Sequence, residues 1–256
     1  MRRNLLSTVM LLITALLATP ACAQLYTGLS GLINTPSADM NEEGNAWVGC
    51  YYMNKHFTPG DDGGTSFAYD GKKYNTTDFY LAITPFRWIE LSYAFTLMKT
   101  KMSGYEEPKY NAKDRYFSIK LNLVREGRYH PAIAIGSNDF IGSPTKRHSD
   151  GGNATGYFCN YYLALTKHFK FAGHDIGMNL AYRYCPNEYN RQWEGVVGGL
   201  TWRPKWVPDL RIIAEYTGNE VNVGMDCLLW KHLFLQATLQ EGKYFSGGIC
   251  FQVNLF

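Results

Sequence analysis

Long stretches in which apolar and polar residues alternate recur along this chain, and they constrain its fold more than any other feature. Between 89 and 97, for example, Ile89, Leu91 and Tyr93 alternate with Glu90 and Ser92. A period of two is typical of a β-strand with one apolar and one polar face. Most of the stretches run for about 9–11 residues, which is the length that a tilted strand needs to cross a bilayer. The pattern therefore predicts an all-β chain built from unusually long strands.

The alternation predicts about twelve strands, with ten to fourteen as the range, near 46–55, 76–84, 88–98, 114–124, 131–139, 156–168, 174–184, 194–203, 210–217, 221–229, 232–240 and 246–255. Through most of the chain, long polar connections (57–75, 99–113, 140–155 and 185–193) alternate with short ones. Long extracellular loops that alternate with short periplasmic turns are typical of outer-membrane barrels. We therefore expect a closed antiparallel transmembrane β-barrel in the bacterial outer membrane, with both termini periplasmic.

The last expected strand places Ile249, Phe251, Val253 and Leu255 on one apolar face, close to the end of the sequence. A lipid environment accounts for such a face if the strand helps to close a barrel, because a bilayer tolerates no unpaired strand edge. A soluble β-sandwich that ends on a core strand is the alternative.

The first residues indicate export. Arg2 and Arg3 precede an apolar stretch over 5–18, and small residues at 19–23 offer a cleavage site after Ala23. The apolar stretch is shorter than the roughly 20 residues of a membrane-spanning helix. A lipoprotein with Cys22 acylated is the alternative. We expect three parts: a signal peptide over 1–23, a lumen or periplasmic segment over 24–45, and the barrel over 46–256.

Composition excludes several classes of partner and site. A formal net charge of +3 is too small to indicate nucleic acid or anionic lipid as a partner. The expected barrel itself implies contacts with outer-membrane lipid and lipopolysaccharide. The cysteines beyond the signal peptide are odd in number and lack metal-ligand spacing. Asp61-Asp62-Gly63-Gly64 lacks the other acidic ligands of a calcium loop, which favours a solvated turn. We expect no metal site and no cofactor.

Alternation also predicts a polar row that faces the lumen, namely Glu90, Lys120, Asn122, Asn179, Arg183, Arg211, Glu215, Asn222, Asp226, Gln236 and Gln240. Both signs of charge are present in balance. Charges shielded from water need partners, so a hydrogen-bonded, filled interior is favoured over a conducting channel. Amides and carboxylates would equally suit a glycan pathway.

Evidence for an enzyme is weak. His148-Ser149-Asp150 lies in an expected loop, with residues adjacent in sequence, whereas catalytic groups usually converge from separate elements. Neither a Gly-x-Ser-x-Gly nucleophile motif nor a His-Glu-x-x-His motif is present. We therefore expect no catalytic residues, and an outer-membrane hydrolase remains the minor alternative.

The segment before the first strand carries a distinctive motif formed by Gly31, Asn34, Thr35, Pro36, Ser37 and Ala38. With Asp114-Arg115, Ser118-Ile119-Lys120 and Asn138-Asp139, it resembles the YjbH-like family of outer-membrane barrels linked to exopolysaccharide biosynthesis and secretion. Pro36 cannot donate to a ladder, so this segment is not a membrane strand. We expect residues 24–45 to lie in the lumen or cap the periplasmic mouth, with a mobile leader as the alternative.

The resemblance implies an accessory or conduit role in polysaccharide export, with polysaccharide and periplasmic export proteins as partners. Larger family members extend beyond one barrel, whereas this chain has room for one. The alternatives are a small closed barrel with a structural or lipid-processing role, and a porin-like channel.

Overall fold

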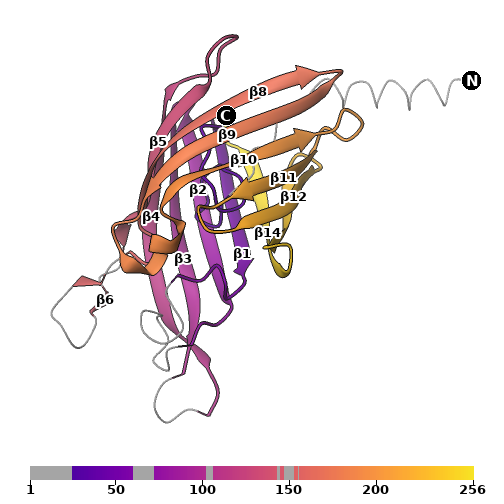
Figure 1. The fold of residues 1–256 in the computed structure, drawn as a ribbon. Helices are drawn as coiled ribbons and strands as arrows, with labels where there is room; N and C mark the ends of the chain where they lie inside the picture. The colour runs from indigo at the N-terminus through magenta and orange to yellow at the C-terminus, as the bar shows by residue number, and fades with distance from the viewer. Residues whose placement is uncertain (1–24, 60–71, 102–105, 143–144, 147–152, 155) are drawn as a thin grey trace, which may run out of the picture.

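The computed structural model describes the chain except residues 1–24, 60–71, 102–105, 143–144, 147–152 and 155. Twelve antiparallel strands form one closed barrel, in which sequence neighbours pair and β1 closes against β14 (Figure 1). The predicted closed antiparallel barrel of about twelve strands is confirmed. The expected signal peptide, Asp61-Asp62 and His148-Ser149-Asp150 lie outside the described residues. No helix in the described part of the chain is long and apolar enough to cross a membrane.

The barrel strands have bounds close to those expected, and they are β1 (Asn45–Met53), β2 (Thr76–Phe86), β3 (Ile89–Thr100), β4 (Lys109–Val124), β5 (Ala132–Gly142), β8 (Asn160–Phe171), β9 (His174–Tyr184), β10 (Gly195–Arg203), β11 (Leu210–Tyr216), β12 (Val221–Leu229), β13 (Leu233–Gln240) and β14 (Tyr244–Asn254). The short strands β6 (Thr145–Lys146) and β7 (Asn153–Ala154) pair with each other outside the barrel. A 3-10 helix, η1 (Glu188–Trp193), joins β9 to β10.

The two ends of the barrel differ. Short connections such as 87–88, 172–173 and 230–232 lie at one end, together with the start of β1 and the end of β14, and we call this the turn end. The longest connections lie at the opposite end, which we call the loop end, and two connections there, 217–220 and 241–243, are short. β4 has 16 residues and β11 has 7, so the wall is taller around β4 than around β11 (Figure 1).

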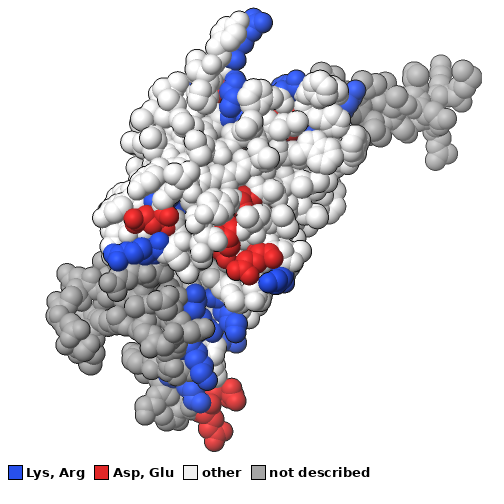
Figure 2. Space-filling model, in the orientation of Figure 1, with Lys and Arg blue, Asp and Glu red and all other residues white. Residues whose placement is uncertain are grey.

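The two faces of the wall differ in chemistry, as the alternation predicts. Outward side chains in mid-strand are apolar and partly exposed, including Val48, Leu81, Leu91, Phe117, Leu163, Leu180, Leu200, Val223, Leu235 and Phe251. The face seen in Figure 2 has a broad uncharged band between the charged residues near its two ends. Inward positions hold buried Ser, Thr, Asn, Gln and charged residues, together with buried apolar side chains such as Trp47, Tyr80 and Phe234. The continuous apolar face is therefore the outer one, as in a membrane barrel.

Exposed aromatic residues gather at both rims of the barrel. Trp88, Trp202, Trp206 and Trp230 lie near the turn end, whereas Tyr52, Tyr161, Tyr184 and Tyr216 lie near the loop end. Aromatic rims of this kind flank the apolar band of membrane barrels. Three further aromatic residues near expected strand ends, Trp47, Tyr51 and Tyr157, are buried and do not belong to the rims. Trp47, for example, packs edge-on against Phe234 with ring centroids 5.8 Å apart.

Candidate functional site

Residues 25–41, which we call the plug, lie inside the barrel. Side chains from β3, β4, β8, β9, β11 and β13 contact this segment by hydrogen bonds, so the wall surrounds it on several sides. Leu25, Leu29, Leu32 and Ile33 are at most 2% exposed. The sequence analysis considered the lumen, the periplasmic mouth and a mobile leader as positions for residues 24–45. The structure places residues 25–41 in the lumen. The lumen is therefore filled in this conformation.

A tight turn forms the tip of the plug nearest to β11. Gly31 and Pro36 form a bridge, and the Leu32 N–H donates to the Thr35 carbonyl at 2.9 Å. The successive N–H groups of residues 33, 34 and 35 all donate to the Glu215 carboxylate at 3.0 Å. Consecutive N–H groups that converge in a turn form a concave anion site. The family-like motif thus folds into a cradle for a carboxylate supplied by the wall.

The remaining wall contacts go mainly to the plug's carbonyl oxygens. Six side chains from four strands each donate to one plug carbonyl oxygen. They are Lys120 to Ser30 (2.9 Å), Arg211 to Gly31 (3.0 Å), Gln236 to Leu32 (3.3 Å), Arg183 to Asn34 (2.9 Å), Asn179 to Pro36 (2.8 Å) and Asn122 to Ala38 (3.2 Å). Side chains of the wall therefore replace the main-chain partners that a strand would provide. This arrangement satisfies backbone groups that burial would otherwise leave unpaired.

Charged pairs support these contacts. The Lys120 ammonium lies 3.6 Å from the Glu90 carboxylate, and the Arg211 guanidinium lies 3.0 Å from Asp226. All four side chains are at most 2% exposed. Glu90 also accepts from the N–H groups of Ser30 and Asn41, so it holds the plug at two points. Loss of one partner from a buried pair costs about 3–5 kcal/mol, because it leaves a charge uncompensated.

The wall also makes room for the plug. A Cβ atom added at Gly199 of β10 would lie 2.5 Å from the Leu32 Cδ2 atom and 2.6 Å from the Ala214 carbonyl oxygen. Only glycine allows the leucine side chain to approach the sheet this closely. Gly44, with a φ of +86°, connects the plug to β1 in a backbone conformation that favours glycine. Shape and polar contacts therefore both specify the position of the plug.

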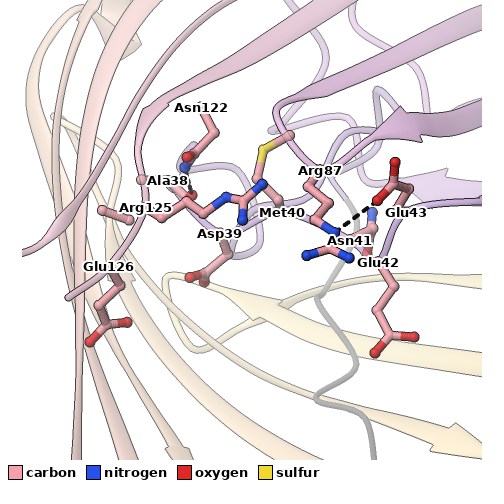
Figure 3. Close-up of a pocket in the computed structure, with 11 residues that line it drawn as sticks. Ala38, Asp39, Met40, Asn41, Glu42, Glu43, Arg87, Asn122, Arg125 and Glu126 are labelled. Carbon is pink, nitrogen blue, oxygen red and sulfur yellow. Dashed lines mark hydrogen bonds and ion pairs between the residues drawn. The ribbon is translucent and has the colours of Figure 1, made fainter. Parts of the chain in front are cut away.

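A cavity of about 540 Å³ opens at the turn end, where the chain leaves the lumen. Figure 3 shows charged side chains around it, from residues 39–43 of the chain and from the two adjacent turns. Four carboxylates (Asp39, Glu42, Glu43 and Glu126) face two guanidinium groups (Arg87 and Arg125). Arg87 donates to Glu43 at 2.8 Å. The mouth of the barrel is therefore polar and mixed in charge.

A second cavity of about 540 Å³ adjoins the first and shares Asp39, Met40 and Glu126 with it. Glu126 bridges the β4–β5 turn to β8, because it contacts Lys167 at 2.8 Å and His168 at 2.9 Å. Partial burial raises the pKa of Glu126, but hydrogen bonds from Lys167 and His168 outweigh this effect and lower the pKa below its usual value. His168 also lies 3.9 Å from Asp39, next to the end of the plug.

The structure brings the expected lumen row together around the plug. Glu90, Lys120, Asn122, Arg183, Arg211, Glu215 and Gln236 bind it directly. Asn222 donates to Glu215 and Asp226 pairs with Arg211, so these two residues act through others. Asn179, which also binds the plug, and Gln240, which donates to Glu220, complete the row, and all eleven side chains except Asn122 are buried.

Sequence reasoning left several buried polar residues out of the lumen row, among them Thr166, Asp78, Asp114 and Asp139. Thr166 accepts the Ala38 N–H at 2.8 Å. Asp78, Asp114 and Asp139 lie toward the loop end and are at most 3% exposed. Asp114 shares the inward face with Tyr116, Ser118 and Lys120, and it lies within the strand expected over 114–124, so the alternation already implies its position.

Comparison with known proteins identifies the family. Residues 23–255 match the family described as exopolysaccharide biosynthesis protein YbjH. The chain belongs to the YjbH family. It is also similar to a protein of Escherichia coli K12 described as an uncharacterized lipoprotein YjbH, at 23% identity over 221 residues. That match covers 74% of this chain and 27% of the relative, so the chain spans about a quarter of the relative's length.

Solved structures similar to this YjbH-family chain include two outer-membrane barrels. An outer-membrane phospholipase of Salmonella typhi is 11% identical, with a TM-score of 0.36 over 84% of this chain and 92% of its own. An outer-membrane channel of Pseudomonas putida F1 is 9% identical, with a TM-score of 0.42 over 86% of this chain and 98% of its own.

Proposed function

We propose that this YjbH-family chain is an outer-membrane barrel that serves exopolysaccharide secretion, with its lumen closed by the plug and opened when the plug withdraws. The turn end then faces the periplasm and both termini are periplasmic. The apolar outer face and its aromatic rims support insertion into a membrane. Membership of the family supports a link to exopolysaccharide.

The observation that carries the proposal is the polar contact between wall and plug. A barrel that stays filled permanently can use an apolar interior, as small eight-stranded barrels are filled by side chains. Here Glu90, Lys120, Arg183, Arg211 and Glu215 face the plug, and each would be hydrated favourably in a water-filled lumen. Hydration of the wall would offset part of the cost of removing the plug. A small free-energy difference between the plugged and the water-filled lumen suits a plug that moves between a bound and a withdrawn position.

The turn-end cavities support entry from the periplasm. They surround the point where the plug leaves the lumen, and their carboxylates, amides and guanidinium groups suit hydrogen bonding to sugar hydroxyls. A glycan or a periplasmic export protein would reach residues 38–43 of the chain there. We assign no catalytic role to the barrel under this proposal, and we expect lipid and lipopolysaccharide at its outer face.

The test combines secretion with conductance. Deletion of the gene should reduce exopolysaccharide in the medium and increase it in the periplasm, and the full-length gene should restore secretion. In planar bilayers, the refolded mature chain should be nearly silent, whereas removal of residues 25–41 should give large, stable ion steps. Normal secretion without the gene would contradict the role in export. Restored secretion together with silence from both forms in bilayers would contradict the conduit and indicate a docking role.

A further inference from the structure

The β3–β4 hairpin projects beyond its neighbouring strands at the loop end (Figure 1). Within the described residues, the last β4–β5 pair on this side joins Tyr116 to Gly142, and the last β2–β3 pair joins Thr77 to Leu97. Beyond these points β3 and β4 stay paired with each other to the loop-end limit of both strands. Residues 109–115 of β4 therefore extend about 20 Å past the last pair with β5.

The outward row of β4 changes from apolar to basic where the hairpin begins to project. Phe117, Arg115 and Lys113 occupy alternate positions and are all exposed, so they share the outer face of the strand. Arg115 pairs in register with Phe95, and Lys113 pairs with Leu97, which are outward apolar residues of β3. The two cations therefore lie at the border where the apolar band of the barrel ends.

Three further lysines extend this positive charge along the hairpin. The Lys99 ammonium lies 5.0 Å from the centroid of the Tyr110 ring, and Lys101 and Lys109 are exposed. Figure 2 shows Lys and Arg gathered beyond the uncharged band at this end, with acidic residues at the outermost tip. We use the name basic patch for Lys99, Lys101, Lys109, Lys113 and Arg115.

The centre of the basic patch has no acidic partner within the part of the chain that the structure describes. No ion pair there reaches Lys113 or Arg115. Asp114 lies between them in sequence, but its side chain is buried on the inward face of β4. Glu106 and Glu107 are exposed in the connection at the tip. The patch therefore offers uncompensated positive charge to an anion from outside the chain.

We propose that the basic patch binds the phosphate groups of lipopolysaccharide. The inference rests on the orientation in the proposed function, which places the loop end at the outer leaflet. Lipopolysaccharide carries phosphate groups between its acyl chains and its sugars, and Arg115 and Lys113 follow Phe117 at that level of the wall. These two residues are about 7 Å apart along the strand, so both long side chains reach one phosphate group. A guanidinium binds phosphate through two parallel hydrogen bonds, and an ammonium adds a point charge.

The face that carries the patch favours a lipid over an exported glycan. A glycan that leaves the lumen meets the inward row, which Asp114 and Tyr116 occupy at this height. Arg115 and Lys113 point the opposite way, toward the lipid around the barrel. Their apolar stems lie along the wall while their charged ends reach the head groups. The patch therefore ties the tall side of the barrel to the outer leaflet.

Binding of lipid A tests the proposal, measured by native mass spectrometry on the refolded mature chain in detergent. The probes are bisphosphorylated lipid A and lipid A that lacks both phosphates. We expect the wild type to bind the phosphorylated form at least about tenfold more tightly. Lys113→Gln with Arg115→Gln should remove most of this preference. Lys170→Gln with Lys205→Gln removes two exposed cations at the turn end and should bind like the wild type.

Three results would overturn the assignment. They are equal affinity of the folded wild type for the two lipids, an unchanged preference in the folded Lys113 and Arg115 variant, and displacement of lipid A by oligogalacturonate, a soluble acidic glycan. If the variant does not fold, the comparison of the two lipids on the wild type still decides. The binding assay is independent of export. Normal secretion without a lipid A preference would contradict this inference alone, and failed secretion tests with the preference intact would contradict only the proposed function.

Discussion

Replacement of Glu215 by glutamine should loosen the plug. The Oε2 atom accepts N–H groups from residues 33, 34 and 35, and Oε1 accepts from Asn34 and Asn222. Glutamine has nearly the same size but offers one acceptor oxygen. Its NH₂ group would stand where one carboxylate oxygen was, and would point N–H donors at the N–H donors that this oxygen accepted. All three N–H groups at the tip of the plug would therefore exchange a charged acceptor for a neutral one.

The size of the effect follows from these bonds. A hydrogen bond to a charged group contributes about 1.5–3 kcal/mol and one to a neutral group about 0.5–1.5 kcal/mol, so three weakened bonds cost about 3–5 kcal/mol. Water that enters the opened lumen regains part of this, and we take the lower limit of about 3 kcal/mol. Because about 1.4 kcal/mol corresponds to a factor of ten, the ratio of open to closed lumen should rise about a hundredfold.

Planar-bilayer recording measures this ratio directly, as the fraction of time for which refolded single barrels conduct. Glu215→Gln should open about a hundredfold more often than wild type. Glu241→Gln, which changes an exposed loop-end acid, is the matched control and should behave like wild type. Both variants should keep the gel mobility of a folded barrel. A folded Glu215→Gln barrel that opens no more often than the control would refute the carboxylate cradle as the support of the plug.

Three further predictions concern stability and reactivity. Lys120→Met should destabilise the barrel by about 3–5 kcal/mol by leaving Glu90 unpaired, and Lys120→Met with Glu90→Gln should recover part of this loss in urea unfolding. Burial raises the pKa of Cys159 and of Cys185 to about 11, so iodoacetamide near pH 8 should alkylate both thiols only after unfolding. The folded state lowers the pKa of Glu126, so the stabilisation that its carboxylate provides is complete above the usual pKa of 4.5 and is lost as the pH falls through the lower folded pKa. Unfolding midpoints measured against pH should show this loss in the wild type and not in Glu126→Gln.

The strands and the lumen row are predictable because a period of two fixes which face each side chain occupies. That rule alone places Glu90, Lys120, Arg211 and Glu215 inside the barrel. It is less successful in β1, where Trp47 and Tyr51 point inward despite being aromatic. Aromatic residues suit both a membrane rim and a packed interior, so their type alone does not indicate the face.

The plug's contacts are beyond sequence reasoning for a different reason. The turn over residues 32–35 depends on backbone geometry, and its match to Glu215 joins positions about 180 residues apart. The inward position of Asp139 could not be predicted. Its φ is +52° and it lies beside an irregularity in the β4–β5 register, where alternation no longer tells which face a side chain occupies. Asp78 is different, since it precedes Tyr80 and Ala82 on the inward face of β2 and the alternation already implies its position.

The wall binds the plug mainly through main-chain atoms, and this has a consequence for how the protein tolerates sequence change. Backbone N–H and carbonyl groups are the same in nearly every residue, so most plug side chains could be exchanged while the hydrogen bonds remained. Substitution should be most restricted at Gly31, Pro36 and Gly44, which set the path of the chain, and at the charged residues of the wall. A synthetic peptide with the same turn but a different sequence should then be able to reseal a barrel from which residues 25–41 have been removed.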